Sequence, residues 1–162
     1  MKQLMSTGLL LLSTTVMANM GANPALAQTS VSTETSGQAI ANLDGSTYQF
    51  EGTCLLMGRN GAMQLRVMAP GTGPEGEAVF LTLYATSFAP TQYVIHGGAT
   101  PDKAREAAMA DTRETWNVRG ATTKDATEFS EDGAMITGPA QVSENGEIIS
   151  SNHTIEINVN GC

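Results

Sequence analysis

A strict alternation of apolar and polar residues near the C-terminus is the feature that most constrains the fold of this chain. Ile155, Ile157 and Val159 alternate with polar neighbours, and this period of two places their side chains on one face of a β-strand. The other face of such a strand meets water, which is typical of an antiparallel sheet. Other segments either alternate in the same way or are rich in residues that favour strands. They predict further strands at 48–57, 63–68, 79–84, 92–95, 115–119, 126–129 and 133–142.

Glycine, asparagine and proline residues separate these segments at short intervals. The pairs Asn60-Gly61 and Asn145-Gly146 predict tight hairpin turns, because Asn and Gly tolerate a positive φ. Many short strands with frequent turns predict an all-β fold. We expect a small antiparallel β-sandwich, with a barrel-like arrangement as the alternative, of about seven to eight strands.

One segment departs from the strand pattern. Thr100 is a suitable N-cap, Pro101 suits the first helical position, and residues 103–110 favour a helix by composition. A helix this short is marginal when isolated. We therefore expect one short helical excursion over residues 100–110, at the surface between two strands.

Residues 1–27 have the layout of a cleavable secretory signal peptide. One positive charge, Lys2, precedes an apolar run, and Ala25 and Ala27 form a small-residue cleavage signature before Gln28. The run is shorter than the roughly 20 apolar residues that a membrane-spanning helix needs. We therefore predict cleavage between Ala27 and Gln28, no transmembrane segment, and a periplasmic or secreted mature protein.

The remaining residues divide into a leader and a domain. Residues 28–45 are rich in Ser, Thr, Ala and Gly and predict a flexible polar leader, since this composition buries little apolar surface. Residues 46–162 are long enough for a single β domain with its own core. The formal net charge is −8 and the basic residues are not clustered, which argues against a nucleic-acid partner.

Cys54 and Cys162 are the two cysteines of the chain. Two cysteines in an exported protein usually pair, because the compartment is oxidising. We predict an intramolecular disulfide, which would close most of the domain into one loop and tie down the chain end. A free thiol and an intermolecular bridge are the alternatives.

Few residues point to catalysis or metal binding. His96 and His153 are the only histidines, and neither lies in a motif typical of a hydrolase triad. Two histidines and two paired cysteines are too few for a zinc site. Met57, Met63 and Met68 could bind Cu(I) with His96, but methionines more often fill gaps in a core. We predict no catalytic residue, no metal and no cofactor.

Trp116 and His96 are the candidate binding residues. Trp116 is the only tryptophan and could offer a stacking platform to a glycan, although a core position is the more usual role of this residue type. The acidic pair Glu75 and Glu77 lies in a loop rich in Gly and Pro. Paired carboxylates can hydrolyse glycosides across a cleft, but acids in loops are usually only solvated.

Four short features carry a family resemblance. Cys54 closes the segment 50–54 on an early predicted strand, a Thr-Gly-Pro-Ala segment spans 137–140, a closing strand spans 154–159, and Cys162 follows that strand. In these features residues 46–162 resemble the mycobacterial 19-kilodalton antigen (LpqH-like) envelope protein family. The resemblance implies a compact β fold, a disulfide from the first strand to the C-terminus, and an envelope role without established catalysis. The family's lipid-acceptor cysteine is missing here, so lipid anchoring is not implied.

These features favour an exported, non-catalytic envelope or periplasmic protein that acts as a binding or interaction module. Its partner would be a protein, a glycan or a small apolar ligand. The alternative is a secreted inhibitor of a partner protein, which would present the loops at 69–77 and 97–113. A small envelope hydrolase that uses carboxylates is the third and weakest interpretation.

Overall fold

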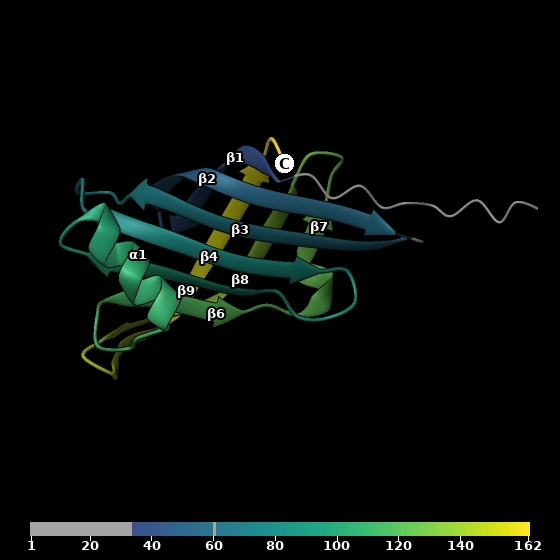
Figure 1. The fold of residues 1–162 in the computed structure, drawn as a ribbon. Coiled ribbons are helices and arrows are strands. Elements are labelled where there is room, and N and C mark those ends of the chain that lie inside the picture. The colour runs from purple at the N-terminus through teal and green to yellow at the C-terminus, as the bar shows by residue number, and fades with distance from the viewer. Residues whose placement is uncertain (1–33, 60) are drawn as a thin grey trace, which may run out of the picture.

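A computed structural model describes residues 34–59 and 61–162, which form one antiparallel β fold (Figure 1). The all-β class expected from the sequence is confirmed. The predicted signal peptide, with its cleavage site at Ala27 and Gln28, lies outside the described residues. The elements are β1 (Thr35–Leu43), β2 (Ser46–Arg59), β3 (Ala62–Thr72), β4 (Ala78–Thr86), β5 (Gln92–Gly98), α1 (Pro101–Ala110), β6 (Asn117–Ala121), the 3-10 turn η1 (Lys124–Ala126), β7 (Thr127–Phe129), β8 (Ala134–Glu144) and β9 (Glu147–Asn160).

Eight of these strands close into a barrel. Each strand from β1 to β5 pairs antiparallel with the strand that follows it, β8 pairs with β9, and β9 pairs with β1. The ring closes where β6 pairs with β8, from Asn117 opposite Ser143 to Arg119 opposite Gln141. The short strand β7 pairs with the other half of β8. The chain thus adopts the barrel-like alternative and not the sandwich, because alternation marks a buried face without showing whether the sheet closes.

Side chains fill the inside of the barrel. The alternating residues of β9 predicted to face the core, Ile155, Ile157 and Val159, are at most 1% exposed. Leu65 and Leu81 come from strands on other parts of the wall and are fully buried with them in one core cluster. Burying a side chain of this size contributes about 1.5–3 kcal/mol. The interior is therefore a packed core.

Strand β1 corrects the domain boundary predicted from the sequence. The expected flexible leader over 28–45 is wrong from Thr35 onward, because Thr35–Leu43 is a wall strand between β2 and β9. Ala39, Ala41 and Leu43 face the core. Two of these inward residues are alanines, so the alternation carries little hydrophobic signal. The ladder partners on both sides, the neighbouring β2 and the distant β9, decide the structure of this segment.

The predicted intramolecular disulfide is present. Cys54 on β2 bonds Cys162, and their Cα atoms are 5.6 Å apart. The Thr35 hydroxyl donates to the Cys162 carbonyl oxygen at 3.0 Å. Gly37 lies under the bridge, where a Cβ would come 2.5 Å from the Cys54 Sγ. The disulfide therefore joins β2 and the chain end beside the first residues of β1.

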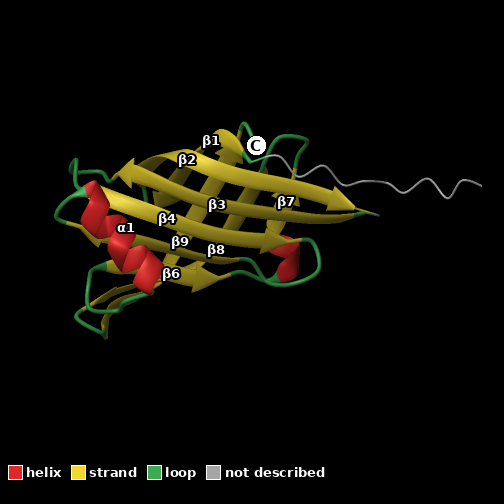
Figure 2. Ribbon diagram, viewed as in Figure 1, coloured by secondary structure: helices red, strands yellow, loops and turns green. Residues whose placement is uncertain are grey.

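The predicted helix is confirmed as α1, and it packs on the outside of the barrel (Figure 2). The Thr100 hydroxyl caps it by accepting from the Lys103 backbone N–H. Its buried face presents Ala104 and Ala108 to Phe80 of β4. In the described part of the chain, no helix is long and apolar enough to cross a membrane.

Candidate functional site

One end of the barrel carries the turns that join β1 to β2, β3 to β4 and β8 to β9, together with the α1 connection. This end lies at the left of Figure 1. A hollow of about 610 Å³ opens there. We call this hollow the mouth, and its lining residues are Tyr48, Pro74, Glu75, Glu77, Ala78, Gly97, Gly98, Glu114, Thr115, Trp116 and Glu144.

Two stacked aromatic rings lie in the mouth. Tyr48 and Trp116 have ring centroids 6.2 Å apart and planes inclined by 22°. Tyr48 lies near the start of β2 and is only 4% exposed, whereas Trp116 is half-buried against the edge of the core. A Cβ at Gly97 would come 2.9 Å from the Trp116 ring. Glycine at this position therefore lets the indole lie close to the β5 backbone.

Four carboxylates surround the aromatic pair. Glu75 and Glu77 come from the β3–β4 turn, Glu114 precedes Trp116, and Glu144 ends β8. The Glu77 carboxylate also accepts from the Glu75 backbone N–H at 2.9 Å, which fixes the turn. Burial raises the pKa of Tyr48, and the negative charges of Glu77 and Glu75 raise it further. The mouth thus combines an aromatic surface with negative potential.

The mouth also contains a polar group without a protein partner. The Thr115 hydroxyl oxygen is buried and accepts or donates no hydrogen bond among the described residues. Thr115 lines the same hollow as Trp116. An unpaired buried hydroxyl is costly unless water or a ligand satisfies it. The arrangement of the rings and carboxylates suits a ligand with a cationic group over the rings.

His96, the other candidate binding residue, does not line the mouth. Tyr93 and Ile95 of β5 point into the barrel, so His96 points outward. Only 1% of it is exposed, its Nε2 lies 4.0 Å from the Asp111 Oδ1, and its Nδ1 has no hydrogen-bond partner among residues 34–59 and 61–162. Burial lowers its pKa, the nearby Arg119 lowers it further, and Asp111 opposes the change. His96 is thus a buried neutral side chain that a ligand cannot reach in this structure.

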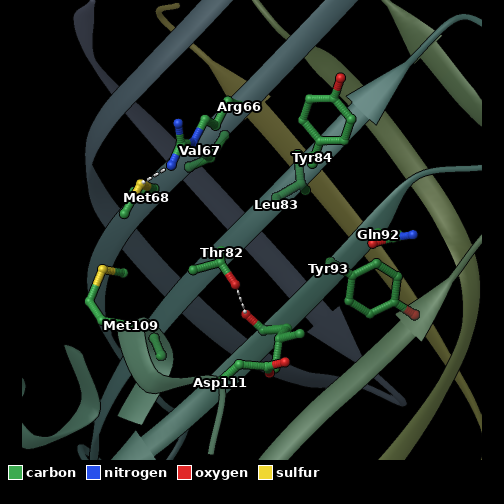
Figure 3. A pocket seen from close by; sticks show the side chains of 12 residues that line it. Arg66, Val67, Met68, Thr82, Leu83, Tyr84, Gln92, Tyr93, Met109 and Asp111 are labelled. Carbon is green, nitrogen blue, oxygen red and sulfur yellow. Dashed lines mark hydrogen bonds between the residues drawn. The ribbon is translucent and has the colours of Figure 1, made fainter. Parts of the chain in front are cut away.

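A second hollow lies on the outer wall of the barrel (Figure 3). It measures about 390 Å³ and is formed by outward side chains of β3, β4 and β5 beside the end of α1. Arg66 points toward Met68, with its Nη2 3.2 Å from the sulfur, while Asp111 lies across the groove. This outer hollow is lined by charges of both signs, and no stacked pair of aromatic rings lies in it. The mouth is therefore the stronger candidate.

Sequence reasoning identified Trp116 and the Glu75–Glu77 pair but not the rest of the site. Tyr48, Glu114 and Glu144 join them only because the barrel closes. Glu131 and Asp132 are adjacent acidic residues too, but they lie in the turn before β8 at the opposite end of the barrel. Within the described residues, no three His, Cys, Asp or Glu side chains converge as metal ligands.

Comparisons with protein-family models, with curated proteins and with solved structures find no match for this chain.

Proposed function

We propose that this protein is an exported binding module that takes an organic cation at the mouth of its barrel. The observation that carries the proposal is the stacked Tyr48–Trp116 pair surrounded by four glutamates. Aromatic rings attract cations through their quadrupole, by about 0.5–2 kcal/mol depending on desolvation. The ligand class is a quaternary ammonium group or the cationic side chain of a peptide.

The packed interior narrows the ligand classes expected from the sequence. A small apolar ligand would need an enclosed cavity, but side chains fill the barrel core. The mouth has a volume within the range of small-molecule sites, roughly 300–1,000 Å³. Its four lining carboxylates also disfavour an apolar or anionic ligand, because both would leave these charges unpaired.

Export to the periplasm or the medium is part of the proposal. The Cys54–Cys162 disulfide supports it, because such bonds persist in oxidising compartments. The pattern of residues 1–27 supports it as well. An envelope role of the kind found in the LpqH-like family is compatible with a module of this size.

The test uses Trp116 as its reporter, because it is the only tryptophan in the chain. Choline, its neutral isostere 3,3-dimethyl-1-butanol and N-acetylarginine amide are titrated separately while tryptophan emission is recorded. We expect saturable changes with the cations and none with the neutral isostere. A stronger response to either cation distinguishes the small ammonium ligand from the peptide side chain. Equal binding of choline and its isostere would contradict the proposal.

Charge-neutralised variants show whether the glutamates contribute. In a Glu114→Gln/Glu144→Gln double variant we expect the dissociation constant to rise roughly three- to tenfold, since each exposed charge pair contributes about 0.2–1 kcal/mol. Glu131→Gln removes an exposed carboxylate at the opposite end and is the matched control. The same affinity in both variants would argue against recognition of charge.

A second candidate function, inhibition of a partner protein, is favoured by a different observation. Ile148 and Ile149 are 61% and 57% exposed on the β8–β9 hairpin, whose tip extends beyond the β1 ladder. The loops expected for this role differ from the observed structure. The first part of 69–77 belongs to β3, which ends at Thr72, and α1 occupies much of 97–113. Under this function, Ile148→Asp would abolish inhibition and Ile40→Asp, on the exposed face of β1, would not.

A further inference from the structure

A serine, a histidine and an aspartate form a hydrogen-bonded chain at the same end of the barrel as the mouth. The Ser150 Oγ lies 2.6 Å from the His153 Nε2. The His153 Nδ1 hydrogen-bonds the Asp44 Oδ2. The other Asp44 oxygen accepts from the Thr154 backbone N–H at 3.0 Å. This order of contacts is the one through which serine hydrolases activate their nucleophile.

A β-bulge brings Ser150 and His153 together. In a regular strand, residues three apart point to opposite faces. The β8–β9 register shifts between Ala140 opposite His153 and Val142 opposite Ser150, so two residues of β9 face one of β8. Asn152, inside the bulge, has a φ of 69°, which is uncommon for a residue other than glycine. Bulges of this kind often re-aim side chains next to active sites.

Asp44 is held in position by its own turn. It is the first residue of the Asp44-Gly45 hairpin turn between β1 and β2, and both residues have a positive φ. The Thr154 N–H lowers the pKa of Asp44, and the hydrogen bond from His153 lowers it further. An ionised Asp44 accepts from the His153 Nδ1–H. The Nε2 is then left free to accept the Ser150 hydroxyl proton.

The cluster is open to solvent. The side chains of His153 and Asp44 are 23% and 49% exposed, and Ser150 is half-buried. If the cluster had only a structural role, the hydrogen bonds of Asp44 alone would be enough to hold the β1–β2 turn against β9. That role would not need the Ser150 hydroxyl on the remaining imidazole nitrogen. A structural role therefore explains the contacts of Asp44 and His153 but not the hydrogen bond of Ser150.

We propose that Ser150 is a nucleophile toward carboxylic esters, with His153 as its general base and Asp44 as a positioning residue. The Ser150 Oγ bonds to the ester carbonyl carbon as its proton passes to the His153 Nε2. The bond to the leaving alcohol breaks as that proton returns to the alcohol oxygen. Water then adds to the acyl-serine and gives a proton to His153, and the bond between the acyl group and Oγ breaks as His153 passes that proton to Oγ. The products are an alcohol and a carboxylic acid, and the Ser150 hydroxyl is restored.

The bulge offers groups that suit the developing oxyanion. Its extra residue is outside the β8 ladder, and β1 pairs with β9 only from Ile155 onward. The backbone N–H groups of Ser151 and Asn152 adjoin the nucleophile in the chain. The amide of the residue after the nucleophile is a recurring oxyanion donor in hydrolases. This inference is independent of cation binding, because none of the three side chains lines the mouth.

The experiment treats the full mature chain with a fluorophosphonate probe and locates the adduct by peptide mass spectrometry. We expect one adduct, on Ser150, and hydrolysis of p-nitrophenyl acetate above the buffer rate. Ser150→Ala should lose both. Ser130→Ala, which removes an exposed hydroxyl at the opposite end of the barrel, should keep both and is the matched control. An absent adduct, or labelling that survives in Ser150→Ala, would overturn the proposal.

Two further variants separate catalysis from folding. Asp44→Asn keeps an acceptor for the Thr154 N–H but favours the wrong histidine tautomer. We expect a labelling rate at least tenfold lower, with an unchanged circular dichroism spectrum and loss of a far-downfield imidazole proton resonance. Ser150→Cys should react with iodoacetamide at least tenfold faster than Ser151→Cys. Equal rates for these two cysteines would show that His153 does not activate position 150.

Discussion

The hydroxyl of Tyr93 on β5 donates a hydrogen bond to the carbonyl oxygen of Pro139 on β8, across the backbone of Gly120 on β6. A Cβ at Gly120 would come 2.2 Å from each of these two oxygen atoms. The β6–β8 ladder covers only Asn117 to Arg119, so this contact lies beyond its end. It joins β5 to β8 at the seam between β6 and β8, where the barrel closes.

Tyr93→Phe should therefore destabilise the barrel. Tyr93 is 1% exposed, and the substitution leaves the Pro139 carbonyl without its donor, which costs about 1–3 kcal/mol. Urea unfolding followed by circular dichroism measures the loss. Tyr84→Phe on the adjacent strand β4 is the control, because Tyr84 is 48% exposed and should change stability by less than about 0.5 kcal/mol. Equal midpoints for the two variants would contradict this account of the seam.

The disulfide should supply a large part of the stability. Cys54 and Cys162 are 108 positions apart, and a loop of this length is expected to contribute about 4–5 kcal/mol by restricting the unfolded chain. In urea unfolding of the oxidised proteins, Cys54→Ser and Cys162→Ser should lower the free energy of unfolding by similar amounts. Added reductant should lower the free energy of unfolding of the wild type to that of the variants. A wild type that matches its variants before reduction would show that the bond contributes little.

Strand β1 makes the domain boundary testable. A chain that begins at Glu34 keeps all nine strands, whereas one that begins at Ser46 lacks β1 and opens the ladders of β2 and β9. We expect the first to unfold cooperatively and the second to lack a cooperative transition, with exposed core that binds a hydrophobic dye. A cooperative transition in the shorter chain would mean that β1 is dispensable.

The sequence predicted the elements whose signals are local. The alternation at 155–159 became β9, the Thr100 cap began α1, and the Asn145-Gly146 pair formed a hairpin turn. The disulfide followed from the number of cysteines and the expected compartment. Each of these inferences needs only a few neighbouring residues or a count.

The features that escaped prediction depend on contacts between distant segments. The barrel closes through three residue pairs between β6 and β8, and no local pattern encodes them. His96 alternates out of phase with Ile95, which indicates an outward side chain, but only the docking of α1 explains its burial. The Ser150–His153–Asp44 chain needs a bulge in β9 and a turn more than a hundred residues earlier. Candidate sites made of such residues become visible only in the fold.

Acidification should destabilise the domain through His96. Burial lowers its pKa, Arg119 lowers it further, and Asp111 only partly opposes them. In the unfolded chain this histidine takes up a proton near its ordinary pKa of about 6.5. Below that pH the unfolded state binds a proton that the folded state does not, so the free energy of unfolding falls until the pH reaches the lower folded pKa.

The measurement is the free energy of urea unfolding between about pH 7.5 and pH 5, where His96 titrates and most carboxylates remain ionised. We expect a decline of up to about 1.4 kcal/mol per pH unit from this group. His96→Gln loses the titrating ring, so its stability should depend less steeply on pH over the same interval, whatever its stability at pH 7.5. The comparison uses slopes, so a destabilised variant is still informative. Identical slopes for wild type and His96→Gln would mean that protonation of His96 does not oppose folding.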